Sequence, residues 1–242
     1  MIILLSALLA ATASSSAPPL ALAATAGRPS ACGDSSTTES RVCRALQAQK
    51  AGDSAGAAQD FENAAKALPD KDPQAARLWA AAGNLWIEAN QPAQAASALD
   101  RALAAPGLAG PQRGEALLDR ARAAEAQGEL KVARARLSEA APTISDDPFY
   151  WYFSSALAIR EGDSATAKSA IDKALSLAPN EPTILFEAGH VADLAGDDSA
   201  ARSYWMRAAS GDPGGAVGRA AAKAVEMLGV TPTVKSEPQA AK

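Results

Sequence analysis

The residues best suited to chemistry in this sequence are a single histidine, two cysteines and two adjacent pairs of aspartates. His190 is the only histidine among 242 residues, so any histidine-dependent nucleophile would have to act through it. The sequence contains no H-E-x-x-H or C-x-x-C motif and no phosphate-binding glycine loop. One histidine and two separated cysteines do not supply a set of converging metal ligands. We therefore predict that the protein is not an enzyme and uses no cofactor or metal.

The aspartate pairs Asp146-Asp147 and Asp197-Asp198 have a simpler explanation than catalysis. Each pair stands where a helix is predicted to begin. A carboxylate there can cap the unpaired backbone N–H groups and complement the positive end of the helix dipole.

The two cysteines, Cys32 and Cys43, are candidates for a disulfide if the protein is exported to an oxidising compartment. The bond would close a short loop and, in the chain-entropy model, would stabilise the fold by roughly 3 kcal/mol. Two free thiols are the alternative. Lipid modification of Cys32 is disfavoured, because the preceding Pro29-Ser30-Ala31 lacks the leucine expected near the start of a lipobox.

The N-terminal stretch is typical of an export signal. An apolar run covers 2–13, small residues lead to Ala26, and the first charged residue is Arg28. The run is short for a membrane span and is followed by Pro18-Pro19, although an anchor or a disordered tail remains an alternative. The usual Lys or Arg near the N-terminus is missing. We predict a signal peptide over 1–26, a flexible leader over 27–38 and a disordered tail over 229–242.

The charge balance argues against a nucleic-acid partner. The net charge is −4, and residues 1–26 carry no Asp, Glu, Lys or Arg, so cleavage would leave the chain equally acidic. The densest run of basic residues, from Arg113 to Arg136, is interleaved with four acidic residues and followed by a fifth, Glu139. That mixture is typical of a solvated helical face and not of a basic stripe.

A recurring unit organises the rest of the chain. The pairs Pro148/Pro182, Gly162/Gly196, Ala167/Ala201 and Pro179/Pro213 are each separated by 34 residues. A fixed period in this range indicates a repeat array. In each unit, a cap such as Asp147-Pro148 opens one helix, a glycine such as Gly162 ends it, and a second helix follows with Ser164 as a candidate N-cap. The predicted units cover 39–70, 73–106, 111–145, 147–180 and 181–213, with a capping helix over 214–228.

These units resemble the tetratricopeptide repeat family, whose pattern is W-x2-L-G-x2-Y followed by A-x3-F, an alanine and a closing proline. The second unit matches both halves of the pattern with Trp79, Ala82, Gly83, Trp86, Ala95, Leu99 and Ala102. The fifth matches with Leu185, Gly189, Ala192, Ala201, Trp205, Ala208 and Pro213. The resemblance implies an all-α, right-handed solenoid of about five helical hairpins plus a C-terminal cap.

The resemblance also implies where a partner would bind, since such arrays usually bind protein segments in the concave groove lined by the first helix of each unit. Transferred by repeat position, the groove residues are Arg77, Asn84, Glu88, Arg122, Phe149, Tyr152, Arg160, Phe186 and His190. The lysine expected of a carboxylate-binding clamp is replaced by Ala80. The match to such a clamp is therefore too poor to support one.

One segment, from Phe149 to Phe153, places five of the chain's eleven aromatic residues in a row. Consecutive helical side chains diverge by about 100°, so the five cannot all point into the core. Trp151 matches a core position of the family, and Phe149 shares a face with Tyr152. Two interpretations of Phe149 and Tyr152 stay open: binding residues of the groove, or packing residues of an alanine-rich core.

The expected function follows from these points. We predict a non-catalytic protein-interaction module of the bacterial cell envelope, exported and periplasmic, without a membrane span once the signal is removed. Its partner would be a protein or peptide of unknown identity, and no nucleic acid is expected. The alternative is a structural or assembly subunit of a secretion, outer-membrane or polysaccharide-export complex that uses convex faces and termini. The sequence does not fix the oligomeric state.

Overall fold

The computed structural model of the chain describes residues 32–33, 36–69 and 71–228. The predicted signal peptide over 1–26 and the predicted tail over 229–242 lie outside the described residues, as does part of the predicted leader. None of the described helices is both long enough and apolar enough to span a membrane.

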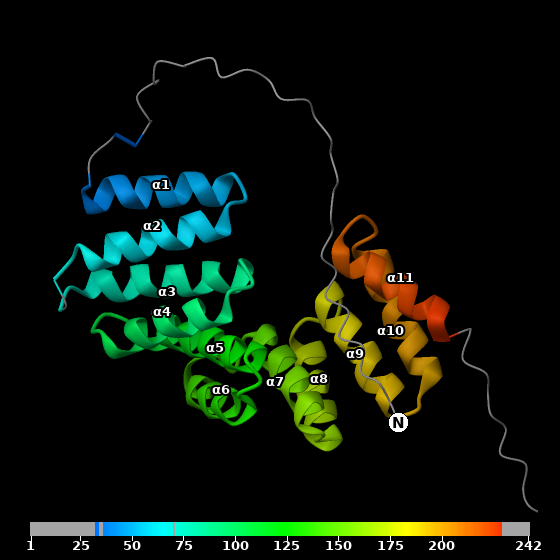
Figure 1. The fold of residues 1–242 in the computed structure, drawn as a ribbon. Coiled ribbons are helices and arrows are strands. Elements are labelled where there is room, and N and C mark those ends of the chain that lie inside the picture. The colour runs from blue at the N-terminus through cyan, green and yellow to red at the C-terminus, as the bar shows by residue number, and fades with distance from the viewer. Residues whose placement is uncertain (1–31, 34–35, 70, 229–242) are drawn as a thin grey trace, which may run out of the picture.

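The described part of the chain folds into eleven helices with no strand, and these follow one another as a curved array of antiparallel pairs (Figure 1). The first three pairs are α1 (Thr38–Lys50) with α2 (Ser54–Lys66), α3 (Pro73–Glu88) with α4 (Pro92–Ala104), and α5 (Gly110–Ala126) with α6 (Leu130–Ile144). The last two pairs are α7 (Pro148–Glu161) with α8 (Ser164–Leu177) and α9 (Pro182–Leu194) with α10 (Asp198–Gly211), after which α11 (Ala216–Leu228) packs on α10. The predicted all-α solenoid is confirmed.

Local signals set the helix ends. The Asp147 carboxylate caps α7 by accepting a hydrogen bond from the Phe149 N–H at 2.8 Å, as predicted. Gly162 ends that helix with φ of 77°, a left-handed conformation that costs glycine little. The prediction of Ser164 as the next N-cap was wrong by one residue. Asp163 takes that place, because its carboxylate reaches both the N–H and the hydroxyl of Thr166, and these hydrogen bonds hold its pKa below the ordinary value.

The core runs along the array as a series of apolar clusters between neighbouring helices. Alanines occupy most of the buried positions, so a few large side chains fill the remaining volume. Leu99, Leu137, Leu157, Ile184 and Leu185 are the largest of the almost fully buried apolar side chains. Stability therefore depends on those few residues more than on a broad apolar core.

A disulfide joins Cys32 to Cys43 on α1, with their Cα atoms 5.4 Å apart. The Cys32 side chain is buried. The bond ties residue 32, from the segment predicted as a flexible leader, to the first helix of the array.

The basic run between Arg113 and Arg136 forms ion pairs and is not uniformly solvated. Arg136 pairs with Glu139 at the surface. Arg120, by contrast, is buried, and its Nε donates to Asp100 at 2.8 Å. The prediction of a solvated face was therefore wrong for Arg120, which lies on the side of α5 that packs toward α4.

Candidate functional site

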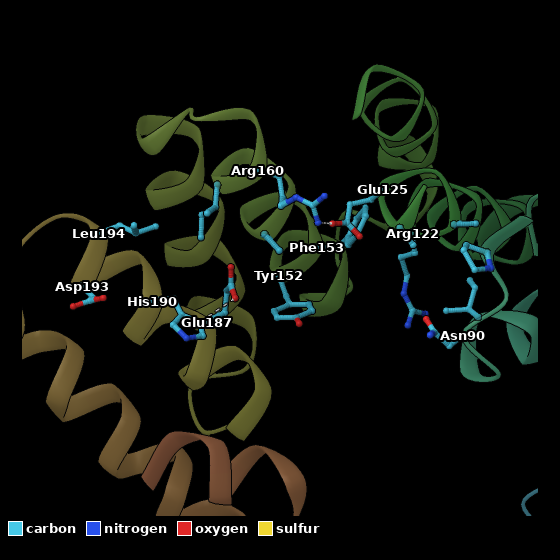
Figure 2. A pocket seen from close by; sticks show the side chains of 16 residues that line it. Asn90, Arg122, Glu125, Tyr152, Phe153, Arg160, Glu187, His190, Asp193 and Leu194 are labelled. Atoms are coloured by element: carbon cyan, nitrogen blue, oxygen red, sulfur yellow. Dashed lines mark hydrogen bonds and ion pairs between the residues drawn. The ribbon is translucent and has the colours of Figure 1, made fainter. Parts of the chain in front are cut away.

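A pocket of about 600 Å³ opens on the face formed by the first helices of successive pairs (Figure 2). We call it the central groove. Its lining residues come from α3, α5, α7, α9, the turn between α3 and α4, and the start of α4. They are Ile87, Asn90, Pro92, Arg122, Ala123, Glu125, Ala126, Tyr152, Phe153, Ala156, Ile159, Arg160, Glu187, His190, Asp193 and Leu194.

The aromatic run divides between core and groove. Tyr150 and Phe153 are buried, whereas Trp151 and Tyr152 are half-buried and Phe149 is 43% exposed. Phe149 packs edge-on against Tyr152, with the ring centroids 6.3 Å apart, so the two share a face as predicted. Tyr152 lines the central groove, and Phe149 supports its ring from outside the lining. Trp151 is less buried than its family position implies, and its indole N–H donates to the Ser145 carbonyl at 2.7 Å.

Tyr152 lies between the charged side chains of α5 and α9 (Figure 2). Burial raises the pKa of its phenol above the ordinary value, and the Glu187 carboxylate raises it further. Arg122 opposes this shift and Glu125 adds to it. The hydroxyl is therefore a neutral hydrogen-bonding group at physiological pH.

We expect Tyr152 to ionise above pH 10.0, the ordinary value for tyrosine. In the unfolded chain the phenol ionises at about 10, so the neutral side chain contributes its full stability below that pH. This contribution is lost as the pH rises through the raised pKa of the folded state. Subtracting the phenolate absorbance of Tyr152→Phe from that of the wild type during an alkaline titration isolates this group. A difference curve centred at or below pH 10.0 would contradict the prediction.

The two arginines of the groove are each paired with a carboxylate. The Arg160 guanidinium on α7 forms an ion pair with Glu125 on α5. Arg122 Nη1 donates to Asp119 Oδ1 at 3.0 Å, and the other oxygen of Asp119 accepts from Asn84 Nδ2 at 2.9 Å. Asp119 thus links two predicted groove residues on neighbouring units.

Neither Asp119 nor Glu187 was among the predicted groove residues. A usable signal existed for Asp119, because Asn84 and Asp119 are 35 residues apart, as are Glu125 and Arg160. Residues about one repeat unit apart lie on the first helices of adjacent units, where complementary side chains can meet.

His190 lies in the groove on α9 and has an aromatic and acidic environment. Its ring is 4.4 Å from the Phe186 ring and 5.5 Å from the Trp205 ring, measured between centroids. Its Nδ1 is 3.7 Å from Glu187 Oε2, a contact that is an ion pair only when the histidine is protonated. Within the described residues, no three or more His, Cys, Asp or Glu side chains converge as a metal site would require.

The structure thus brings together Arg122, Tyr152, Arg160 and His190 in one groove. Arg77 and Asn84 line a second pocket, of about 480 Å³, between α3 and α5, together with Asp119. Glu88 and Phe186 line neither pocket. The Glu88 carboxylate accepts a hydrogen bond from Ser54 on α2, and Phe186 packs beside Trp205.

Comparison with known proteins defines the class of fold. No protein-family model and no curated protein matches the sequence. Among solved structures, PilW, a widely conserved type IV pilus biogenesis factor, is 21% identical with a TM-score of 0.63, covering 77% of this chain and 83% of its own. PilF of Pseudomonas aeruginosa is 16% identical with a TM-score of 0.60, covering 77% of this chain and 82% of its own. YrrB, a tetratricopeptide repeat protein with an unusual peptide-binding site, is 16% identical with a TM-score of 0.53, covering 78% of this chain and 94% of its own.

These likenesses, together with the helix pairs and their period, establish the fold. The chain has the fold of a tetratricopeptide-repeat solenoid, as the sequence resemblance implied.

Proposed function

We propose that this chain is a non-catalytic protein-interaction module whose central groove holds a segment of a protein partner. The observation that carries the proposal is the groove itself. It combines a half-buried tyrosine, apolar side chains such as Ile159 and the 63%-exposed Leu194, and charged groups at the rim. Aromatic residues and arginines in such a setting are the types most enriched at binding hot spots.

Two further points support the proposal without identifying the partner. One solved structure of the same fold, YrrB, is described as having a peptide-binding site, although an unusual one. The signal-like N-terminus favours an exported, periplasmic protein, and the likeness to PilW, a pilus biogenesis factor, agrees with a role in the cell envelope.

The test is site-specific photocrosslinking in living cells that make the full chain. A photoreactive side chain at Tyr152 is expected to capture one segment of one protein, identified by mass spectrometry of the crosslinked peptide. The matched control carries the same probe at Lys131, an exposed position on α6 outside the groove. Lys131 is preferable to Arg134 on the same helix, because Arg134 is paired with Glu161. Equal capture from both positions, or capture from Lys131 alone, would contradict the groove as the binding site.

The second candidate function is a structural or assembly subunit that uses the opposite surface. Two large apolar side chains on second helices of their pairs favour it, since Leu177 on α8 is 38% exposed and Met206 on α10 is 55% exposed. Capture from Lys131 but not from Tyr152 would be the result that this alternative predicts.

A further inference from the structure

Some charged side chains of the central groove are paired with an opposite charge and others are not, and this restricts what the groove can bind. Its lining holds two arginines against three carboxylates, which leaves one negative charge in excess when His190 is neutral. Asp119, just outside the lining, adds another acidic group and already holds Arg122. The groove is therefore acidic although its rim carries two arginines.

Each of the two arginines is already paired with a carboxylate of α5, so an incoming anion would meet that carboxylate as well as the arginine. The Arg160–Glu125 and Arg122–Asp119 pairs join a cation to a carboxylate that is 22% and 16% exposed, respectively. Breaking either pair would leave a largely buried carboxylate without its cation, which is costly. An acidic tail or a C-terminal carboxylate is thus a poor ligand for this groove.

The carboxylates on α9 have no such compensation. The Glu187 side chain is 12% exposed and forms no ion pair with a lysine or arginine, and its Oε2 lies 3.7 Å from His190 Nδ1, which is a cation only when protonated. Asp193 forms no side-chain hydrogen bond or ion pair with any other described residue, and it is exposed at the end of the helix. Glu187, His190 and Asp193 are spaced three residues apart, so they form one stripe that faces the groove (Figure 2).

The surface beside this stripe suits the stem of a long cationic side chain. Ile159, Ala156 and Leu194 offer apolar contact, and the Tyr152 ring stands close to Glu187 (Figure 2). Lysine and arginine pack their methylene stems on apolar surface while the charged head reaches a polar group. A cation over an aromatic ring gains further attraction.

Resting on the function proposed above, we infer that the central groove selects a partner segment with a lysine or arginine flanked by apolar residues, and that Glu187 binds this cation with help from Asp193. The partner is thus defined by its charge, opposite to that of the groove. Arg122 and Arg160 hold the acidic side chains of α5 in place and do not contact the cation.

The experiment is a selection of random short peptides, displayed as a library, on the immobilised full chain. Lysine or arginine is expected to be enriched over aspartate and glutamate at one position with apolar neighbours. Replacing that cation by methionine in a selected peptide should weaken its Kd for the wild-type protein about tenfold, the effect of losing one charge-assisted contact. With Glu187→Gln the same replacement should have little effect, because the acceptor charge is already gone.

The matched control is Glu226→Gln on α11, which removes one negative charge from an exposed position outside the groove. Glu226→Gln should keep the tenfold difference in Kd between the two peptides. If the cation is instead attracted by the overall negative charge of the protein, Glu187→Gln and Glu226→Gln should reduce that difference equally. Enrichment of acidic residues or of free C-terminal carboxylates would overturn the inference.

The same experiment separates this inference from the proposed function. Peptides that bind the wild type without a preference for a cation, and lose binding to Tyr152→Ala, would refute the charge selection and leave the groove intact as a binding site. Peptides that bind Tyr152→Ala equally well would place binding elsewhere and contradict both. A selection that enriches no peptide would also count against both.

Discussion

Replacing Trp205 by alanine is expected to lower the free energy of unfolding by about 3–5 kcal/mol. Trp205 is 4% exposed, and its indole N–H donates to the Phe186 carbonyl on the facing helix at 3.0 Å. The ring lies so close to α9 that a Cβ added at Gly189 would be 2.2 Å from it. Three of the four other buried residues of this cluster are alanines, so they cannot fill the volume that the indole leaves.

The measurement is urea denaturation followed by far-ultraviolet circular dichroism. Met206 provides the control, because it is the next residue on α10 and 55% exposed. Met206→Ala should change the stability by no more than about 0.5 kcal/mol. A loss as small as this for Trp205→Ala would mean that the indole does not anchor the last helix pair.

Leu157→Ala is expected to lower the free energy of unfolding by about 2–5 kcal/mol. It should also make unfolding less cooperative. Leu157 is 0% exposed and belongs to the cluster that joins α7 to α5 and α6, together with Leu117, Leu137 and Phe153. In a repeat array each unit contacts only its neighbours, so the loss falls on the junction between the third and fourth pairs.

We expect the Leu157→Ala variant to unfold over a broader range of urea, with the amides of α7–α10 exchanging hydrogen faster than those of α1–α4. Leu177→Ala on α8, where the side chain is 38% exposed, is the matched control and should leave both the midpoint and the exchange pattern nearly unchanged. Uniformly faster exchange along the whole array would contradict a local weakening of this junction.

The elements of the fold were predictable because their signals are local. The Asp147-Pro148 cap and the Gly162 stop act through backbone groups within one or two turns, so the sequence carries them directly. The period of 34 residues then implies stacked pairs, because no single pair can bury its own apolar face. Even the error at Ser164 was confined to the adjacent residue, since Asp163 and Ser164 are both competent caps.

The groove was predictable only in outline. Helical geometry places Phe149 and Tyr152 on one face, and the family resemblance turns that face toward the groove. The degree of burial depends on the neighbouring units, however, and these leave Trp151 half-buried while covering Tyr150 and Phe153. The extent to which a residue of one unit is covered is set by the angle between units, which no local sequence signal specifies.

The helices, their period and the positions from which side chains could reach a groove follow from the amino-acid sequence, because these depend on short-range backbone geometry and on the burial of apolar faces. The electrostatic character of that groove depends instead on how the units stack. Glu125 and Arg160 are neighbours because the array brings successive first helices together, and Glu187 is left without an arginine by the same arrangement. Coulomb energies depend on distances between side chains and on their exposure, and both quantities exist only once the units have stacked.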